Sequence, residues 1–168
     1  MRPTITFLLC CFFGTILMAT HNQTSEIIYQ QIDELTIEAT IITYTQTSSV
    51  QADRDSLIIC WGDGTCETLL RSNDGGNPIE NDFKVNTYVG KHTYPGLDQY
   101  TLSMSNPNRN GGILNVNSPN SVEVQFHIQT TFTLRNLSEG SNQSPSLLIA
   151  PIDVGFVRQP FMHPPQCC

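Results

Sequence analysis

The sequence predicts an all-β protein built as an antiparallel β-sandwich. Several short stretches alternate apolar and polar residues, which is typical of half-buried strands. Turns rich in glycine, asparagine and proline separate these stretches. No stretch after the N-terminal segment repeats its apolar residues at the helical period of about 3.6 positions. About seven or eight strands within about 115 residues describe a sandwich.

The expected strands follow one another at short intervals. Leu35, Ile37 and Ala39 begin the first long alternation, with threonine and glutamate on the opposite face. The longest alternation is the last one, and it has one apolar and one wet face. We expect strands at 27–30, 35–45, 57–61, 65–70, 83–89, 100–104 and 122–134, with an edge strand at 147–149. The loops between them are the polar stretches at 46–55, 71–82 and 106–112.

The stretch CWGDGTC, from Cys60 to Cys66, predicts a tight hairpin between two of these strands. Gly62 and Gly64 supply the positive φ angles that a short hairpin needs, and Asp63 is tolerated at its tip. The stretch also holds the single tryptophan of the chain, Trp61, which we expect to anchor the core.

The same hairpin brings two cysteines together. With a three-residue loop at 62–64, Cys60 lies opposite Cys66 on the neighbouring strand, within reach of a disulfide. Their spacing is a poor zinc signature, because zinc-binding knuckles separate their cysteines by about two to four residues. Cys60 and Cys66 are therefore the disulfide candidates.

Export is predicted from the N-terminus. Residues 1–19 hold one basic residue and an apolar run that is too short for a membrane span of roughly 20 residues. We expect a signal peptide whose cleavage leaves no transmembrane segment and a secreted or cell-surface protein. Such proteins fold under oxidising conditions, which favours the disulfide. Cys167 and Cys168 are expected to be a ragged terminus or an intermolecular hook.

The charge of the chain limits its partners. The 8 basic and 15 acidic residues give a net charge of −7, and no cluster of lysine or arginine is present. Nucleic acids and anionic membranes attract basic patches, so neither is expected as a partner. Exposed strand faces rich in threonine, glutamine and asparagine suit protein or carbohydrate at a cell surface.

Three separated motifs resemble the signature of PKD domains. They are WGDGT at 61–65, HTYPG at 92–96 and YTLSM at 100–104, where Leu102 stands in the usual place of a valine. That family is an Ig-like antiparallel β-sandwich, which the resemblance therefore implies. The structural signature that it implies consists of Trp61, Gly62, Asp63, Gly64, His92, Tyr94, Gly96 and Tyr100.

A wider stretch, about residues 19–161, is similar to the N-terminal region of large exported surface proteins of Bacteroidetes-type bacteria. The similarity is carried by ATHN at 19–22, PNRN at 107–110 and PID at 151–153. Such proteins are gliding-motility-associated or adhesin-like and end in a sorting domain for type IX secretion. From Asn136 on, the chain is rich in serine, asparagine and proline and loses alternation, so we place the sandwich at 25–135. Residues 136–168 are expected to be a linker or the truncated start of a following module.

Candidate catalytic and metal-binding groups are few. Asp63, His92 and a serine would make a triad, yet no nucleophile-elbow sequence surrounds any serine. We expect Asp63 to hydrogen-bond its own turn, His92 and Tyr94 to pack near Trp61, and no enzyme activity. Calcium is the one cofactor left open, and its candidate ligands are Asp63, Asp74, Asp82 and Asp98. No EF-hand spacing is present, which favours solvated acidic loops.

The sequence therefore predicts a non-catalytic extracellular interaction or spacer module of an adhesin-like surface protein. The alternative is an accessory PKD domain of a truncated exported hydrolase, either a protease or a glycosidase. A spacer stiffened by calcium is a third possibility. Fold alone does not choose between them, and the sequence leaves the oligomeric state open.

Overall fold

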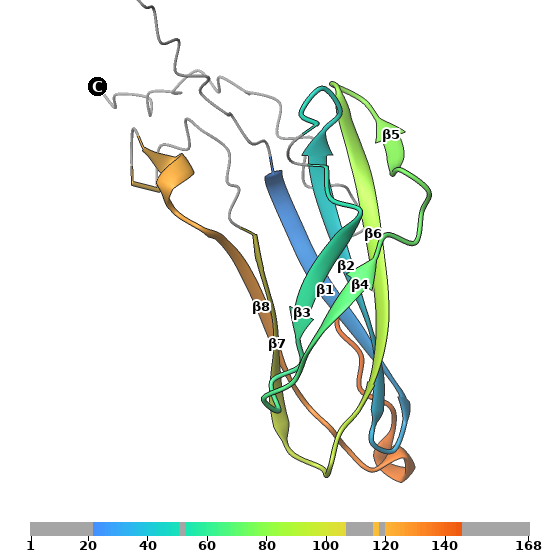
Figure 1. The fold of residues 1–168 in the computed structure, drawn as a ribbon. Helices are drawn as coiled ribbons and strands as arrows, with labels where there is room; N and C mark the ends of the chain where they lie inside the picture. Colours follow the sequence, from blue (N-terminus) through green and yellow to red (C-terminus); the bar gives the residue numbers. More distant parts are fainter. Residues whose placement is uncertain (1–21, 51–52, 107–115, 118–119, 146–168) are drawn as a thin grey trace, which may run out of the picture.

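The computed structural model describes residues 22–50, 53–106, 116–117 and 120–145 (Figure 1). The predicted signal peptide, the expected strand at 147–149 and the two terminal cysteines lie outside these residues. So do the PNRN and PID motifs. In the described part of the chain, no helix is long and apolar enough to cross a membrane.

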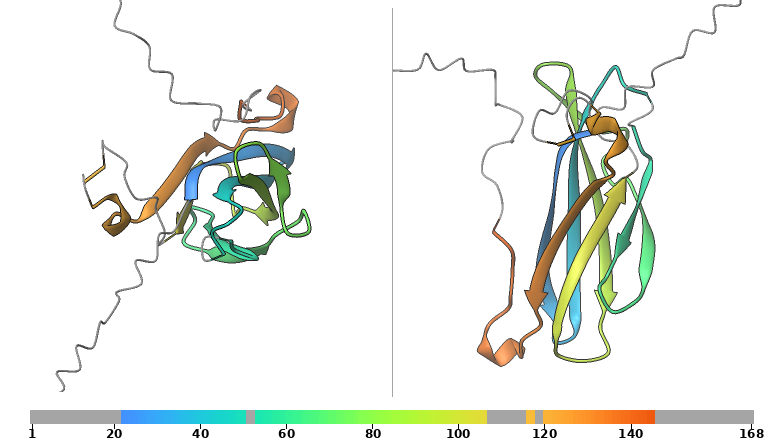
Figure 2. Two further views of the ribbon diagram at one scale, coloured as in Figure 1. Left: turned by 90° about the horizontal axis from the view of Figure 1, so that it is seen from above. Right: turned by 90° about the vertical axis from the view of Figure 1, so that its left-hand side faces the viewer.

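Eight antiparallel strands in the described ranges form two four-stranded sheets, which pack face to face (Figure 2). The first sheet has the order β1 (Asn22–Asp33), β2 (Thr36–Gln46), β6 (Phe83–Thr93) and β5 (Asn77–Ile79). The second has the order β4 (Cys66–Leu70), β3 (Ser56–Cys60), β7 (Gln99–Asn106) and β8 (Phe126–Thr133). Short 3-10 helices lie at Ser121–Glu123 and Leu137–Glu139. This strand order is that of immunoglobulin-like sandwiches, so the predicted fold class is confirmed.

The core lies between the sheets and is filled by alternate residues of each strand. In β2, Ile37, Ala39 and Ile41 have no exposed surface, as their alternation predicts. Trp61 follows β3 and is 1% exposed. The other buried apolar side chains of this cluster are Ile27, Leu57, Ile59, Leu69, Tyr88, Tyr94, Leu102, Met104, Phe126, Phe132 and Leu134. Each large side chain buried in this way contributes about 1.5–3 kcal/mol of stability.

The buried face of strand β6 is not the face that its alternating apolar residues predict. Its alternating apolar residues, among them Phe83 and Val85, lie on the outer face, whereas Asn86 lies inside with no exposed surface. The Asn86 amide donates to the hydroxyls of Thr45 at 2.8 Å and Thr43 at 3.3 Å. Buried polar side chains need hydrogen-bond partners, and the two threonine hydroxyls provide them for the Asn86 amide nitrogen. The Asn86 carbonyl oxygen Oδ1 is buried without a hydrogen-bond partner among the described residues.

Several strands differ from the prediction, and β6 continues to Thr93 instead of ending at residue 89. β1 starts at Asn22 rather than at residue 27, because its backbone pairs with β2 whether or not its side chains are apolar. β5 forms inside the predicted loop 71–82, as an edge strand where Pro78 is tolerated. β8 starts only at Phe126, since residues 121–123 form a 3-10 turn.

The chain after β8 folds back along β1. The backbone N–H of Gln31 donates to the carbonyl of Asn142 at 2.8 Å, and that of Ser144 donates to the carbonyl of Tyr29 at 3.0 Å. The contacts of the sandwich therefore extend to Ser144. The limits at 25–135 and 136–168 stay predictions.

Candidate functional site

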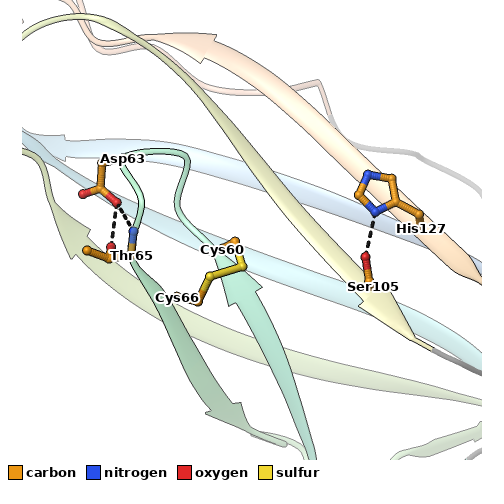
Figure 3. Close-up of a disulfide and its surroundings, with 6 residues drawn as sticks. All are labelled: Cys60, Asp63, Thr65, Cys66, Ser105 and His127. Atoms are coloured by element: carbon orange, nitrogen blue, oxygen red, sulfur yellow. Dashed lines mark hydrogen bonds between the residues drawn. A yellow bond between two sulfur atoms is a disulfide. The ribbon is translucent and has the colours of Figure 1, made fainter.

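The hairpin after β3 has the predicted register and disulfide. Cys60 pairs with Cys66 and is bonded to it (Figure 3). The N–H of Trp61 donates to the carbonyl of Thr65 at 2.9 Å, which closes the loop. Gly62 has a φ of 89°, and a Cβ there would lie 2.6 Å from the backbone of β7. Glycine is required at 62 by both conformation and space.

Asp63 at the tip of this hairpin is fully engaged. Its Oδ1 accepts from the N–H of Thr65 at 2.9 Å and from the Thr65 hydroxyl at 2.6 Å (Figure 3). Its Oδ2 lies 2.7 Å from Nε2 of His92. Burial raises the pKa of Asp63, but the hydrogen bonds from Thr65 and His92 outweigh it and lower the pKa to about 2. Asp63 therefore does more than cap its own turn, because it also binds β6.

The structure brings the other motif residues into one aromatic cluster. His92 stacks on Trp61 with ring centroids 4.8 Å apart. The rings of His92 and Tyr94 meet edge to face, with centroids 4.6 Å apart. The Tyr94 hydroxyl donates to the carbonyl of Trp61 at 2.9 Å. The Tyr100 hydroxyl donates to the carbonyl of Gly96 at 3.0 Å, as in the tyrosine corner of Ig-like domains. Burial raises the pKa of Tyr94, so its hydroxyl stays protonated.

This cluster has the contacts of a packing unit. Asp63 binds Nε2 of His92, the ring nitrogen that faces the hairpin. A catalytic triad also needs a nucleophile that hydrogen-bonds to the histidine. Within the described residues, no serine hydroxyl hydrogen-bonds to His92. The absence of enzyme activity stays a prediction.

The candidate calcium ligands do not converge. Asp82 accepts from the side chains of Gln46 and Ser48, and Asp98 accepts from the backbone of Gln99. Among the described residues, no group of three or more His, Cys, Asp or Glu side chains could hold a metal ion.

A different surface stands out by its chemistry, the outer face of the second sheet. Glu67 is the one charged residue in its four strands, and it pairs with the inward-facing Ile59. The outward positions therefore hold no aspartate, glutamate, lysine or arginine. We call them the uncharged face, and they are Ser56, Ile58, Cys60, Cys66, Thr68, Leu70, Gln99, Thr101, Ser103, Ser105, His127, Gln129, Thr131 and Thr133.

Hydrogen bonds between β7 and β8 order the polar part of the uncharged face. The hydroxyls of Thr101 and Thr131 are 2.9 Å apart, and Nδ1 of His127 lies 2.8 Å from the Ser105 hydroxyl (Figure 3). The wet side of β8 was predicted from its alternation. Its partners on β7 were not, because their register depends on the intervening loop rather than on either strand.

The apolar part of the uncharged face lies over β3 and β4. Ile58 is 56% exposed and Leu70 is 73% exposed. Beside Ile58, a shallow hollow of about 190 Å³ opens between β3 and β7, and Ser56 and Ser105 contribute to its lining. Arg54, which is not part of the uncharged face, borders the same hollow. Apolar and hydrogen-bonding groups therefore share one continuous surface.

Comparison with known proteins does not extend this description. No protein-family model matches the chain. No curated protein matches it. No solved structure matches it.

Proposed function

We propose that this protein is a non-catalytic interaction module of an exported cell-surface protein, and that it binds its partner through the uncharged face. One observation carries the proposal. A chain with a net charge of −7 keeps the outward positions of a whole four-stranded sheet without a charged residue. Most exposed sheet faces carry lysine or glutamate, since these residues are almost always at the surface.

The chemistry of the uncharged face favours a neutral, hydrogen-bonding partner. Hydroxyl, amide and imidazole groups each donate and accept, and burying them against matching groups avoids the cost of desolvating a charge. Ile58 and Leu70 add exposed apolar area of the kind that marks interaction sites. The partner is therefore a neutral polar surface of protein or carbohydrate.

Membership of the PKD family is part of the same proposal. It is supported by the contacts among Trp61, Asp63, His92 and Tyr94, which join motifs that are distant in the sequence. Because all of these residues have structural roles, binding to a partner is left to the faces of the strands. The spacer function follows if the uncharged face has no partner.

Binding to two immobilised panels tests the proposal, one of neutral polysaccharides and one of cell-envelope proteins. We expect binding that changes little between about 0.1 and 0.5 M salt, because no charge lies on the uncharged face. Ser103→Lys, in the middle of that face, should weaken it at least tenfold. The matched control is Thr40→Lys on the outer side of β2, which should bind like the parent. Binding lost at high salt, or equal in Ser103→Lys and the parent, would refute the proposal.

A further inference from the structure

The two sheets have four edge strands, and three of them are protected against pairing with another chain. β5 has three residues, one of which is Pro78. β4 is short, carries Glu67 and is cross-linked to β3. β1 has two irregularities of register, and Gln143 pairs with Gln30 along its edge. Short length, proline, charge, bulges and covering segments are the devices by which proteins guard their edges.

From His127 to Phe132, β8 has none of these devices among the described residues. It is eight residues long, contains no charged residue, proline or glycine, and keeps a regular register with β7 from end to end. From His127 to Phe132, the backbone groups that point away from β7 hydrogen-bond to no other described residue. The first contact on that side is at Thr133, whose carbonyl accepts from the side chain of Asn142. The strand is therefore a long, regular and uncharged template.

We propose that β8 pairs antiparallel with β8 of a second copy of this chain. The two sheets β4-β3-β7-β8 would then join into one continuous sheet across a twofold axis, a symmetry that lets one strand be its own partner. Backbone hydrogen bonds hold the joint, as in other cases of strand addition. The inference does not rest on the proposed function, because it uses an edge and not the uncharged face.

The absence of charge from β8 makes a second copy a suitable occupant of this edge. Two chains that each carry −7 repel one another, and the repulsion is smallest where the surfaces that meet hold no charge. In a register centred on Gln129, His127 lies opposite Thr131 of the second copy, and Phe126 lies opposite Phe132 of the second copy. No like charges face each other in this or in neighbouring registers, and aromatic pairs across antiparallel strands are favourable.

Sedimentation velocity on the full chain tests the proposal, with Cys167→Ser and Cys168→Ser present so that terminal disulfides cannot link copies. We expect a monomer–dimer equilibrium between about 1 μM and about 1 mM protein. Gln129→Lys should weaken the dimer at least tenfold, although it reduces the magnitude of the negative net charge from −7 to about −6 and so reduces general repulsion. Ser103→Lys is the matched control, because Ser103 pairs with Gln129 in register but lies one strand further in. This variant should dimerise like the parent.

Hydrogen exchange gives a second measurement that does not depend on a variant. Amides of residues 127–132 that face away from β7 should become protected as the protein concentration rises. A monomer at every concentration, or a dimer that Gln129→Lys leaves unchanged, overturns the proposal. A dimer that Ser103→Lys also disperses assembles through the uncharged face, which overturns pairing of β8 as well. If Ser103→Lys loses binding to the panels but still forms a normal dimer, the pairing of β8 and the proposed function are tested independently of each other.

Discussion

The two ends of the sandwich are both closed by buried side chains, but one end uses aromatic rings and the other uses polar and charged groups. The aromatic end stacks the rings of Trp61, His92, Tyr94, Tyr100 and Phe132. The polar end joins Thr43, Thr45, Asp53, Arg71, Lys84 and Asn86. The aromatic end depends on packed area, whereas the polar end depends on hydrogen bonds and ion pairs between buried groups.

At the polar end, Arg71 and Lys84 hold the loop between β2 and β3. The Arg71 side chain is 4% exposed, and its guanidinium pairs with the carboxylate of Asp53 and donates to the carbonyl of Arg54 at 2.6 Å. Lys84 Nζ lies 2.6 Å from the other oxygen of Asp53, and the Tyr88 hydroxyl donates to the same Arg54 carbonyl at 2.6 Å. Burial raises the pKa of Asp53, but hydrogen bonds from Lys84 and Arg71 leave it lowered.

Loss of the tryptophan at the aromatic end is the change that should lower the free energy of unfolding most. Trp61→Ala empties the middle of the aromatic end and should lower the free energy of unfolding by about 3–5 kcal/mol. Urea unfolding followed by circular dichroism measures it. Trp61→Phe keeps a ring over His92 and should lose much less. A loss below about 1 kcal/mol in Trp61→Ala would show that packing does not govern this end.

Removal of the guanidinium tests the polar end in the same way. Arg71→Met keeps the apolar stem but removes the charge, so we expect a loss of about 2–3 kcal/mol in urea unfolding. Removing one member of a buried pair leaves the other poorly compensated, and here Lys84 still compensates part of Asp53. The double variant Arg71→Met with Asp53→Asn should lose less than the sum of the single variants. Strict additivity would mean that the pair is not coupled.

The difference between the ends also explains what the sequence could predict of the fold. Strands β2, β7 and β8 are visible because one of their faces is dry and apolar. The buried face of β6 is not visible, since Asn86 is buried only because Thr43 and Thr45, distant in the sequence, receive its amide protons. Polarity predicts exposure for each residue alone, and only the assembled structure supplies the partners.

The candidate site divides along the same line. The disulfide of Cys60 and Cys66 follows from the length of one turn, so local sequence is sufficient. The contact of Asp63 with His92 joins the turn between β3 and β4 to β6 of the other sheet, and each residue alone has a simpler local interpretation. The uncharged face is defined by the lack of charged residues at the outward positions of four strands. It can be recognised only when the register shows which residues point outward.

The disulfide adds a constraint to the aromatic end that the polar end does not have among the described residues. Cys60→Ala with Cys66→Ala should lower the free energy of unfolding by about 2 kcal/mol, since the closed loop is short. Both positions lie on the outer side of the sheet, so no core cavity adds to the loss. Urea unfolding of the double variant measures the effect. Reduction of the parent protein should reproduce it, and masses of the reduced and unreduced protein that are equal would contradict the bond.

The smallest effect that we expect is a titration, and it belongs to Asp63. Its folded pKa of about 2 lies below the value of about 3.9 in an unfolded chain. A lowered folded pKa gives stability that is complete above about pH 4 and is lost as the pH falls towards 2. Asp63→Asn lacks this contribution and should be less stable than the parent by about 1 kcal/mol at pH 6, because pairs this close to the surface are partly screened.

Acidification should weaken both ends, because the pKa of Asp53 is lowered as well. The difference between the parent and Asp63→Asn isolates the aromatic end, since the polar end is the same in both proteins. We therefore expect the two free energies of unfolding, measured in urea at steps from pH 6 to pH 2, to converge below about pH 4. A difference that stays constant over this range would mean that the carboxylate charge of Asp63 contributes nothing. The aromatic end would then rest on its rings and its turn alone.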